Sequence, residues 1–549
     1  MAVRGLAIAA TRERLLAGDP VGASTNASSL TKWPSLPGHA AAAAALAAVL
    51  SGDGGEIGAR SLEAQAAMDL GADAVLESAF GRAVDGHDAP VAAHITALAC
   101  VWRHPLAPLW TAALALEAGD EGPSLRIERE SPSLLGARGL GIRIREVLAA
   151  RRAGARTLAR DRFGRLVCWT NEAGQVVLAP DIAVDLVPAA LVAAVASAAD
   201  GASLRLSLDL DASRLALQAL TGHRGTIVLL DPGSGAILAA VSDPLTLRKG
   251  GTPALEQQRE PASISKLITT AAALRAGLDP DRFVAERPCK GSAHYEGGTL
   301  WCPHEGILSG IDEAMARSCN IAFADLGIAV GRQALLDELR RFGFDAPADE
   351  LLGAAGHVVT PNGNERQLAD LAIGLEATEI TPLHAALLPT VVANEGRMPE
   401  PTFIQGSEGV LGITRLPRAP RPSRPVLDPA FVPTLRRAME AVALYGTGAG
   451  VAPEDFPVAM KTGTAAAWGS GYHVNYVGLA PLPRPAFAFC VRLTHASSSH
   501  VVGRNARTVL HDLLAALAAR ERERAARHLD ATVLRQPQVS RSPWGVSTP

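Results

Sequence analysis

The residues Glu260-Pro261-Ala262-Ser263-Ile264-Ser265-Lys266 follow a loop rich in Gly, Pro and Gln. The apolar run of Ala, Leu and Thr that they open continues to Leu274 and predicts a buried helix. Residues three positions apart share one face of a helix, so we expect Ser263 and Lys266 to lie side by side. A serine is a strong nucleophile only when a base removes its proton, and a lysine is that base only when its pKa is lowered. Taken alone, the pattern is better explained by a first helical turn with a solvated lysine, because it is common by chance.

Two further short motifs follow in order along the chain. Ser318-Cys319-Asn320 lies between a short helical run, 311–317, and a longer one that begins at Ile321. Lys461-Thr462-Gly463-Thr464-Ala465 follows the apolar residues 456–460 and is typical of an edge strand. Each motif alone is weak, and an ordinary turn or strand explains it. The order of all three along one chain is what makes them specific.

The three motifs together resemble the S-x-x-K, S-D-N and K-T-G signature of penicillin-binding proteins and serine β-lactamases, with Cys319 where that signature has Asp. From about Leu204 to about Arg520 the chain is similar to the transpeptidase domain of penicillin-binding proteins. It departs from the family pattern after Gly374, where Leu375-Glu376 replaces the usual Gln-Gly, and at Met460, which replaces a Gly.

The resemblance implies a role for each residue of the first two motifs. Ser263 attacks the carbonyl of a D-alanyl-D-alanine peptide and forms an acyl-enzyme, with Lys266 as the base. Ser318 relays a proton to the leaving amine. Asn320 hydrogen-bonds the substrate amide and fixes Lys266.

The third motif is expected to bind the substrate. Lys461 adds positive potential, and the hydroxyls of Thr462 and Thr464 bind the terminal carboxylate. Gly463 lacks a side chain, so the substrate backbone can approach the strand. The backbone N–H groups of Ser263 and Thr464 hold the oxyanion. This chemistry needs no cofactor, and no metal ligand is assigned to the site.

The function expected from the resemblance is that of a peptidoglycan D,D-transpeptidase, a serine acyltransferase that cross-links stem peptides and binds penicillin covalently. Its expected partners are peptidoglycan stem peptides and β-lactam antibiotics. A β-lactamase, a D,D-carboxypeptidase and a catalytically silent penicillin-binding scaffold remain as alternatives. The long spacing between Ser318 and Lys461, and a large N-terminal region, favour the synthetic enzyme over the compact β-lactamases. No glycosyltransferase motif is evident in residues 1–200.

The predicted fold class is α+β, because runs of strands and runs of helices do not strictly alternate. We expect a central five-stranded antiparallel sheet flanked by helices, built from an early hairpin at 225–241 and three later strands at 461–465, 475–480 and 486–491. This transpeptidase domain is assigned to residues 201–527, and residues 528–549 to a flexible tail.

Residues 1–200 are predicted to form a mostly helical N-terminal module with a small hairpin near 163–180. By analogy with the family, this module serves as a pedestal or as a surface for other cell-wall synthesis proteins. A packed scaffold without any site explains the same Ala-rich helices. The expected helices span residues 40–50, 61–83, 90–102 and 106–118.

Composition excludes some classes of function. The 549 residues carry 52 basic and 55 acidic side chains, a net charge of −3, which gives no reason to expect nucleic-acid binding. No run reaches the roughly 20 apolar residues of a membrane span, and the first ten residues make a poor signal peptide. The family works in the cell envelope, in the periplasm or on the outer face of the cytoplasmic membrane, so that location is expected here.

The chain has six cysteines, which is too few in this length for a disulfide framework. We expect Cys289 and Cys302 to be neighbours in space. They are then joined by a disulfide, bound to zinc together with His304, or two free thiols. Cys319 is not expected as a disulfide partner of either, because it lies inside the active-site turn.

Overall fold

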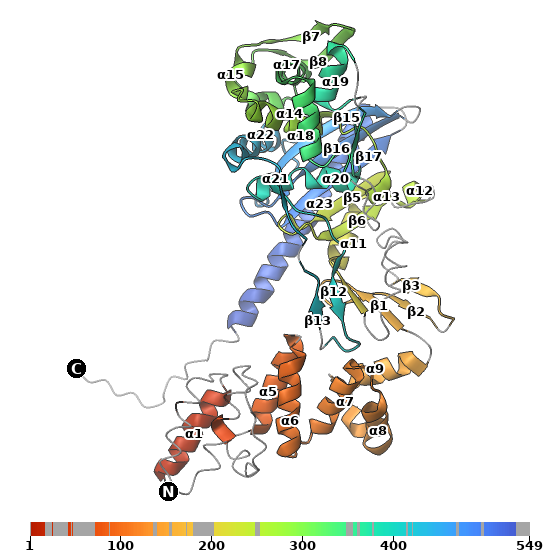
Figure 1. Ribbon diagram of the computed structural model, residues 1–549, viewed down its shortest axis with the longest axis vertical. Coiled ribbons are helices and arrows are strands. Elements are labelled where there is room, and N and C mark those ends of the chain that lie inside the picture. Colours follow the sequence, from red (N-terminus) through yellow and green to blue (C-terminus); the bar gives the residue numbers. More distant parts are fainter. Residues whose placement is uncertain are drawn as a thin grey trace, which may run out of the picture. The chain divides into compact units, whose positions relative to one another are not determined.

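The computed structural model of the chain forms two compact units (Figure 1). The first holds the described residues up to Leu178 together with strand β4 and residues 404–419, and the second holds the remainder. Most of the helix expected at 40–50 and the end of the expected tail lie outside the described residues. The structure describes residues 2–16, 25, 42–44, 47, 72–86, 88–135, 140–152, 156–171, 173–178, 203–247, 253–346, 355–359, 363–375, 378–412, 415–419, 421–467, 471–495 and 499–533.

Helices make up the N-terminal part of the first unit, and local sequence explains where they begin. Asp88 caps one of them by accepting a hydrogen bond from the Val91 N–H at 3.1 Å, and Pro90 occupies its first turn. The elements are α1 (Ala2–Leu16), α5 (Ala72–Asp85), α6 (Ala89–Val101), α7 (Ala107–Glu117), α8 (Gly122–Glu130), the 3₁₀ turn η1 (Pro132–Leu135) and α9 (Leu140–Arg152).

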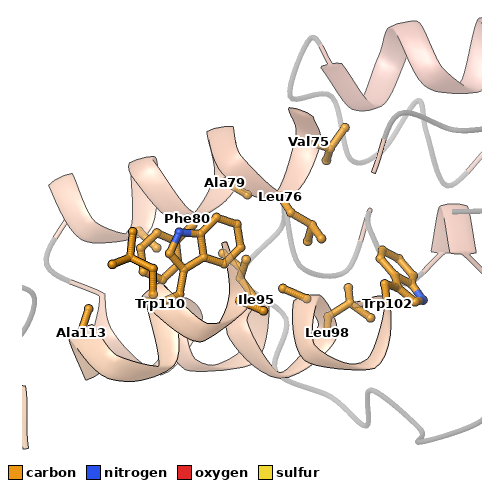
Figure 2. Packing of buried hydrophobic residues seen from close by; sticks show 14 of the residues in the cluster. Val75, Leu76, Ala79, Phe80, Ile95, Leu98, Trp102, Trp110 and Ala113 are labelled. Atoms are coloured by element: carbon orange, nitrogen blue, oxygen red, sulfur yellow. The ribbon is translucent and has the colours of Figure 1, made fainter. Parts of the chain in front are cut away.

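The core of these helices is a single apolar cluster (Figure 2). The rings of Phe80 and Trp110 stack with centroids 4.5 Å apart, and Leu76, Ile95 and Leu98 are buried beside them. Aromatic side chains bury large apolar areas, so this stack supplies much of the packing between α5 and α7.

A six-stranded sheet completes the first unit, in the order β13-β12-β4-β1-β2-β3. Strands β2 and β3 pair antiparallel, with Cys168 opposite Leu178. Strand β4 runs parallel to β1, and the β12–β13 hairpin returns from far along the chain to pair with β4. The boundary drawn from sequence at residue 201 therefore differs from the division by compactness. The strands are β1 (Arg156–Arg160), β2 (Leu166–Thr170), β3 (Val176–Leu178), β4 (Ser203–Leu206), β12 (Ile404–Glu408) and β13 (Arg415–Pro417).

The second unit is built on the five-stranded antiparallel sheet that the sequence predicted, in the order β15-β16-β17-β5-β6. The two early strands are fully buried, and the Lys461 strand lies at one edge as expected. The fold class is thus confirmed. The strands are β5 (Gly225–Leu230), β6 (Ile237–Ser242), β15 (Ala459–Ala467), β16 (Gly471–Ala480) and β17 (Phe487–His495).

Helices and short strands surround this sheet. Helices α11 and α23 contact each other and pack on the sheet, and α13 and α20 form a second such pair. The hairpin of β7 and β8 packs on α17. None of the described helices is both long and apolar enough to cross a bilayer. The elements are α11 (Leu210–Ala219), α12 (Pro244–Leu247), α13 (Pro253–Glu256), η3 (Ala262–Ser265), α14 (Lys266–Arg275), α15 (Pro280–Ala285), β7 (Cys289–Tyr295), β8 (Gly298–Gly306), α16 (Ile311–Ala316), α17 (Asn320–Val330), α18 (Arg332–Arg341), β9 (His357–Val358), α19 (Glu365–Ile373), β10 (Thr378–Glu379), α20 (Pro382–Leu387), α21 (Thr390–Ala393), β11 (Arg397–Met398), β14 (Arg424–Pro425), η4 (Pro429–Phe431), α22 (Val432–Leu444) and α23 (Ser499–Val533).

Candidate active site

Ser263 lies on the 3₁₀ turn η3 and not, as the sequence predicted, on the first turn of a continuous α-helix. Ala262 in front of it has φ of 54°, in the left-handed region that a side chain adopts only at a cost. A hydrogen bond from the Ala262 N–H to the Gly374 carbonyl, 2.8 Å long, holds this conformation. The tight turn half-exposes Ser263, whereas Lys266 at the start of α14 is buried.

Two glycines let other elements close on this turn. A Cβ on Gly374 would lie 2.4 Å from the Ala262 carbonyl oxygen, and one on Gly463 would lie 3.1 Å from the Ser263 nitrogen. Gly463 was expected to admit substrate; in the structure its missing side chain makes room for the turn that carries Ser263. The departure at Leu375 follows Gly374 without disturbing this contact, and Glu376 lies outside the described residues.

Two buried lysines meet at one hydroxyl. Lys266 Nζ donates to the Ser318 carbonyl at 2.8 Å, to Ser318 Oγ at 3.2 Å and to Asn320 Oδ1 at 2.8 Å. Lys461 Nζ donates to the same Ser318 Oγ at 3.0 Å and to the Thr462 carbonyl at 2.7 Å. Among the described residues, no hydrogen bond joins Lys266 to Ser263. The three motifs, far apart in sequence, therefore come together at Ser318.

Burial sets the charge of this pair. It lowers the pKa of Lys266 from its usual value near 10.5 to about 7. The pKa of Lys461 is lowered well below its ordinary value, first by burial and then by the positive charge of Lys266. Two ammonium groups at one hydroxyl repel each other, so neutral amine is present near neutral pH. A neutral lysine amine can accept the proton of a serine.

The threonines of the third motif differ in exposure. The hydroxyls of Thr462 and Thr447 share a hydrogen bond of 2.7 Å, which ties β15 to the loop after α22. Thr462 is nearly buried, whereas Thr464, two residues along the same strand, is exposed. A molecule lying along β15 therefore meets Thr464 more readily than Thr462.

Comparison with known proteins identifies this arrangement. A family model described as "Penicillin binding protein transpeptidase domain" matches residues 225–515, more than half of the chain. The chain belongs to this family.

Relatives of this penicillin-binding protein transpeptidase domain include the "Peptidoglycan D,D-transpeptidase PbpA" of Mycolicibacterium smegmatis. It is 30% identical over 307 residues, which cover 49% of this chain and 61% of that protein. The "Peptidoglycan D,D-transpeptidase MrdA" of Acinetobacter baumannii is 26% identical over 344 residues, which cover 53% and 51%. The chain thus spans between half and three fifths of the length of these relatives.

A solved structure supports the fold. The ceftriaxone acyl-enzyme of penicillin-binding protein A from M. tuberculosis aligns with a TM-score of 0.55 and 21% identity, covering 66% of this chain and 98% of that one. At this identity the likeness shows the fold alone.

Three polar residues that were not predicted from the sequence hold the turn that carries Ser263. Arg492, fully buried on β17, donates to Asn475 Oδ1 at 2.6 Å, and Asn475 donates to the Pro261 carbonyl at 3.3 Å. His473 donates to the Glu260 carbonyl at 2.8 Å. His473 and Asn475 are alternate residues of an apolar strand, so they share one face of it. That alternation was the signal available in the sequence.

A cluster of three thiols lies behind the Ser318 turn of the penicillin-binding fold. Cys289, Cys302 and Cys319, hereafter the three-cysteine cluster, have sulfur atoms within 4.8 Å of one another. The expected proximity of Cys289 and Cys302 is confirmed. Cys319, which was not expected as a disulfide partner, also lies in the cluster, because the β7–β8 hairpin packs on α17 and brings Cys302 Sγ to 3.7 Å from Cys319 Sγ. The His304 side chain is not part of the cluster, and all its thiols are free.

The cluster is chemically asymmetric. The hydrogen bond between the Cys302 and Cys319 sulfur atoms, aided by the Asn320 N–H at 3.2 Å, lowers the pKa of Cys302 to about 4. The same bond raises the pKa of Cys319, and burial raises that of Cys289. Thiolates are the ligands that Zn²⁺ and other soft cations prefer, although a closed tetrahedral site needs a fourth ligand.

Proposed function

We propose that the chain is a peptidoglycan D,D-transpeptidase. Ser263 attacks the carbonyl of a D-alanyl-D-alanine stem peptide, expels the terminal D-alanine and carries the acyl group until an acceptor amine takes it. The observation that carries this proposal is the pair of buried lysines that share the Ser318 hydroxyl beside the nucleophile turn. The names of the two relatives support the substrate class.

The proposal gives a role to Lys266 and to the two residues that hydrogen-bond with it, Ser318 and Asn320. Lys266 is the base, since burial lowers its pKa to about 7 and leaves it partly neutral at neutral pH. Ser318, in contact with both lysines, passes a proton between them and on to the leaving amine. Asn320 Oδ1 accepts a hydrogen bond of 2.8 Å from the Lys266 amine and so holds it in place. The remaining hydrogen-bonding groups of the Asn320 side chain can bind the substrate amide.

Strand β15 binds the substrate in this proposal. Thr464, being exposed, and Thr462 bind the terminal carboxylate, while Lys461 supplies positive potential. Gly463 keeps the strand close to the nucleophile turn. The backbone N–H groups of Ser263 and Thr464 stabilise the oxyanion.

The buried lysines also weigh against a silent scaffold. Burying an ionisable amine without a carboxylate partner costs free energy, and such perturbed groups cluster at catalytic sites. A D,D-carboxypeptidase uses the same groups with water as acceptor, and product analysis with an added acceptor amine separates the two. A β-lactamase would turn over nitrocefin repeatedly.

The proposal extends to place and partners. We infer that the domain acts in the cell envelope, where its peptidoglycan substrate lies. β-Lactams are expected to acylate Ser263; the M. tuberculosis protein of similar fold forms an acyl-enzyme with ceftriaxone. The helices of the first unit are offered as the surface for other cell-wall synthesis proteins.

Labelling with a fluorescent penicillin tests the proposal directly. Ser263→Ala should abolish the covalent label without unfolding the protein, because the hydroxyl fills no packing volume. Ser265→Ala is the matched control, because this serine lies on the same turn but is buried. The Ser265→Ala variant should still be labelled by penicillin. A label that survives in Ser263→Ala, or an adduct mapped to Ser318 by mass spectrometry, would overturn the assignment.

A further inference from the structure

The first unit contains a cavity that the transpeptidase reaction does not use. Its volume is about 580 Å³, and it lies between the end of α5, helix α9, strand β1 and the turn that follows β12. Sites for small molecules usually measure roughly 300 to 1,000 Å³, so the cavity has the size of a ligand site.

Positive charge exceeds negative charge on the cavity wall. Arg143, Arg160 and Arg205 line it, against two carboxylates, Asp85 and Glu408. Glu408 is buried and pairs with two of the arginines: Arg205 Nη1 lies 3.2 Å from one of its oxygens and Arg160 Nε lies 3.4 Å from the other. One buried carboxylate therefore serves two guanidinium groups.

The third arginine has no such partner. In the part of the chain that the structure describes, no carboxylate comes within 4.0 Å of the Arg143 guanidinium, and it donates no hydrogen bond. Burial and then the positive charge of Arg160 lower the pKa of Arg143, while three carboxylates, those of Glu117, Glu408 and Asp85, raise it. An arginine on a cavity wall with five open donors is suited to an anion with two acidic oxygens.

The remainder of the wall is apolar. Val84, Val147, Leu166 and Leu411 line the same space, and Leu411 also belongs to the core of the helices. A ligand that fits this wall needs one negative group at Arg143 and a hydrocarbon part beside it. A doubly charged group fits less well, because the carboxylates of Glu117, Glu408 and Asp85 also act on Arg143.

We propose that this cavity binds a small organic monoanion, a carboxylate or phosphodiester carried on a short apolar chain, with Arg143 as its primary anchor. Arg160 and Arg205 are held in place by their ion pairs with Glu408, and they add positive potential to the cavity. Bidentate pairing of a guanidinium with a carboxylate or phosphate oxygen pair supplies the orientation. The ligand class has two sources, a free fatty carboxylate and a lipid phosphodiester headgroup, which share this chemistry.

The experiment uses the full chain and two probes, octanoate and dihexanoylphosphatidylglycerol below its micelle concentration, followed by isothermal titration. Arg143→Gln should weaken binding roughly ten- to one-hundred-fold, as expected for loss of a charged hydrogen-bond donor. Arg129→Gln is the matched control, because it removes the same charge from an exposed position outside the cavity. Val410→Phe fills the cavity without altering its charge and should also weaken binding.

The outcomes are distinct. Saturable binding lost in Arg143→Gln and in Val410→Phe but kept in Arg129→Gln supports the site, and the probe that binds identifies the source. Equal loss in both arginine variants, or no saturable binding of either probe, would overturn it. Unliganded Arg143→Gln should melt no lower than the wild type, since the side chain has no partner to lose. Penicillin labelling should stay unchanged throughout, so a failure here is separable from a failure of the proposed transpeptidase.

Discussion

Replacing Asn320 with Asp places a carboxylate beside the proposed base with little change of shape. In the structure Asn320 Oδ1 lies 2.8 Å from Lys266 Nζ. Coulomb's law with an effective dielectric constant of about 20 gives roughly 6 kcal/mol at that distance, equivalent to about four pH units. Burial of the new carboxylate opposes part of this attraction, so we expect the pKa of Lys266 to rise by at least about two units.

The consequence for acylation follows from the sign of that shift. Only neutral Lys266 can accept the proton of Ser263, and burial lowers the Lys266 pKa to about 7 in the wild type. The wild-type rate should therefore rise with pH and level off above about 7. With a pKa of about 9 in Asn320→Asp, roughly 1% of the amine is neutral at pH 7 instead of half, which predicts an approximately fiftyfold slower reaction there.

The assay is the second-order rate constant for fluorescent penicillin labelling between pH 5.5 and 10. Asn320→Ala serves as the control, because it removes the hydrogen bond without adding a charge and should lower the rate without moving the midpoint upward. If Asn320→Asp titrates at the wild-type midpoint, or if both variants lose rate equally at every pH, Lys266 is not the titrating base and the reasoning is refuted.

Three further predictions concern stability and the three-cysteine cluster. Burial lowers the pKa of His384 to about 4, below its value in the unfolded chain. The contribution of this neutral histidine to the free energy of unfolding is therefore complete above about pH 6.5 and should fall by up to roughly 3 kcal/mol as the pH drops to 4. The difference in urea midpoint between wild type and His384→Gln should accordingly change between pH 7 and pH 5. Arg492→Met removes three hydrogen bonds, to Asn475 Oδ1 and to the carbonyls of Gln257 and Ile380, and should cost about 3 kcal/mol in urea unfolding. Arg484→Met at an exposed turn should cost almost nothing, and equal effects would contradict the network. Cd²⁺ added to the reduced protein should give one thiolate charge-transfer band per chain, lost in Cys302→Ala; six thiols that all react freely in its presence would remove the metal interpretation.

The fold of the second unit was predictable because its signals are local. Alternating or continuous apolar runs marked the strands, and the order of three short motifs indicated which sheet they build. The sheet of the first unit was not predictable, since β12 pairs with β4 across some two hundred residues and no local pattern states such a pairing. Four and five residues also suffice for these strands, which makes them hard to separate from loops.

The site was predictable as a set of residues, and much less so as a geometry. The motifs named Lys266, Ser318 and Lys461, but their meeting at one hydroxyl depends on Ser318 adopting φ of 54°. The sequence does not indicate which non-glycine residue will adopt a positive φ in the left-handed region. The proximity of Cys319 to Cys302 likewise depends on how β8 packs on α17, a tertiary contact that no local sequence pattern indicates.

The departure from the family pattern at Met460 finds its explanation in a second glycine. Met460 is fully buried next to Lys461, and a Cβ on Gly448 would lie 2.6 Å from its sulfur. The missing side chain at Gly448 therefore makes the room that the larger residue at 460 requires. Thr447, beside Gly448, keeps its hydrogen bond to Thr462, so the strand holds its place against the loop. Because the accommodation is local, Lys461 still reaches Ser318, and the substitution gives no reason to expect an inactive site.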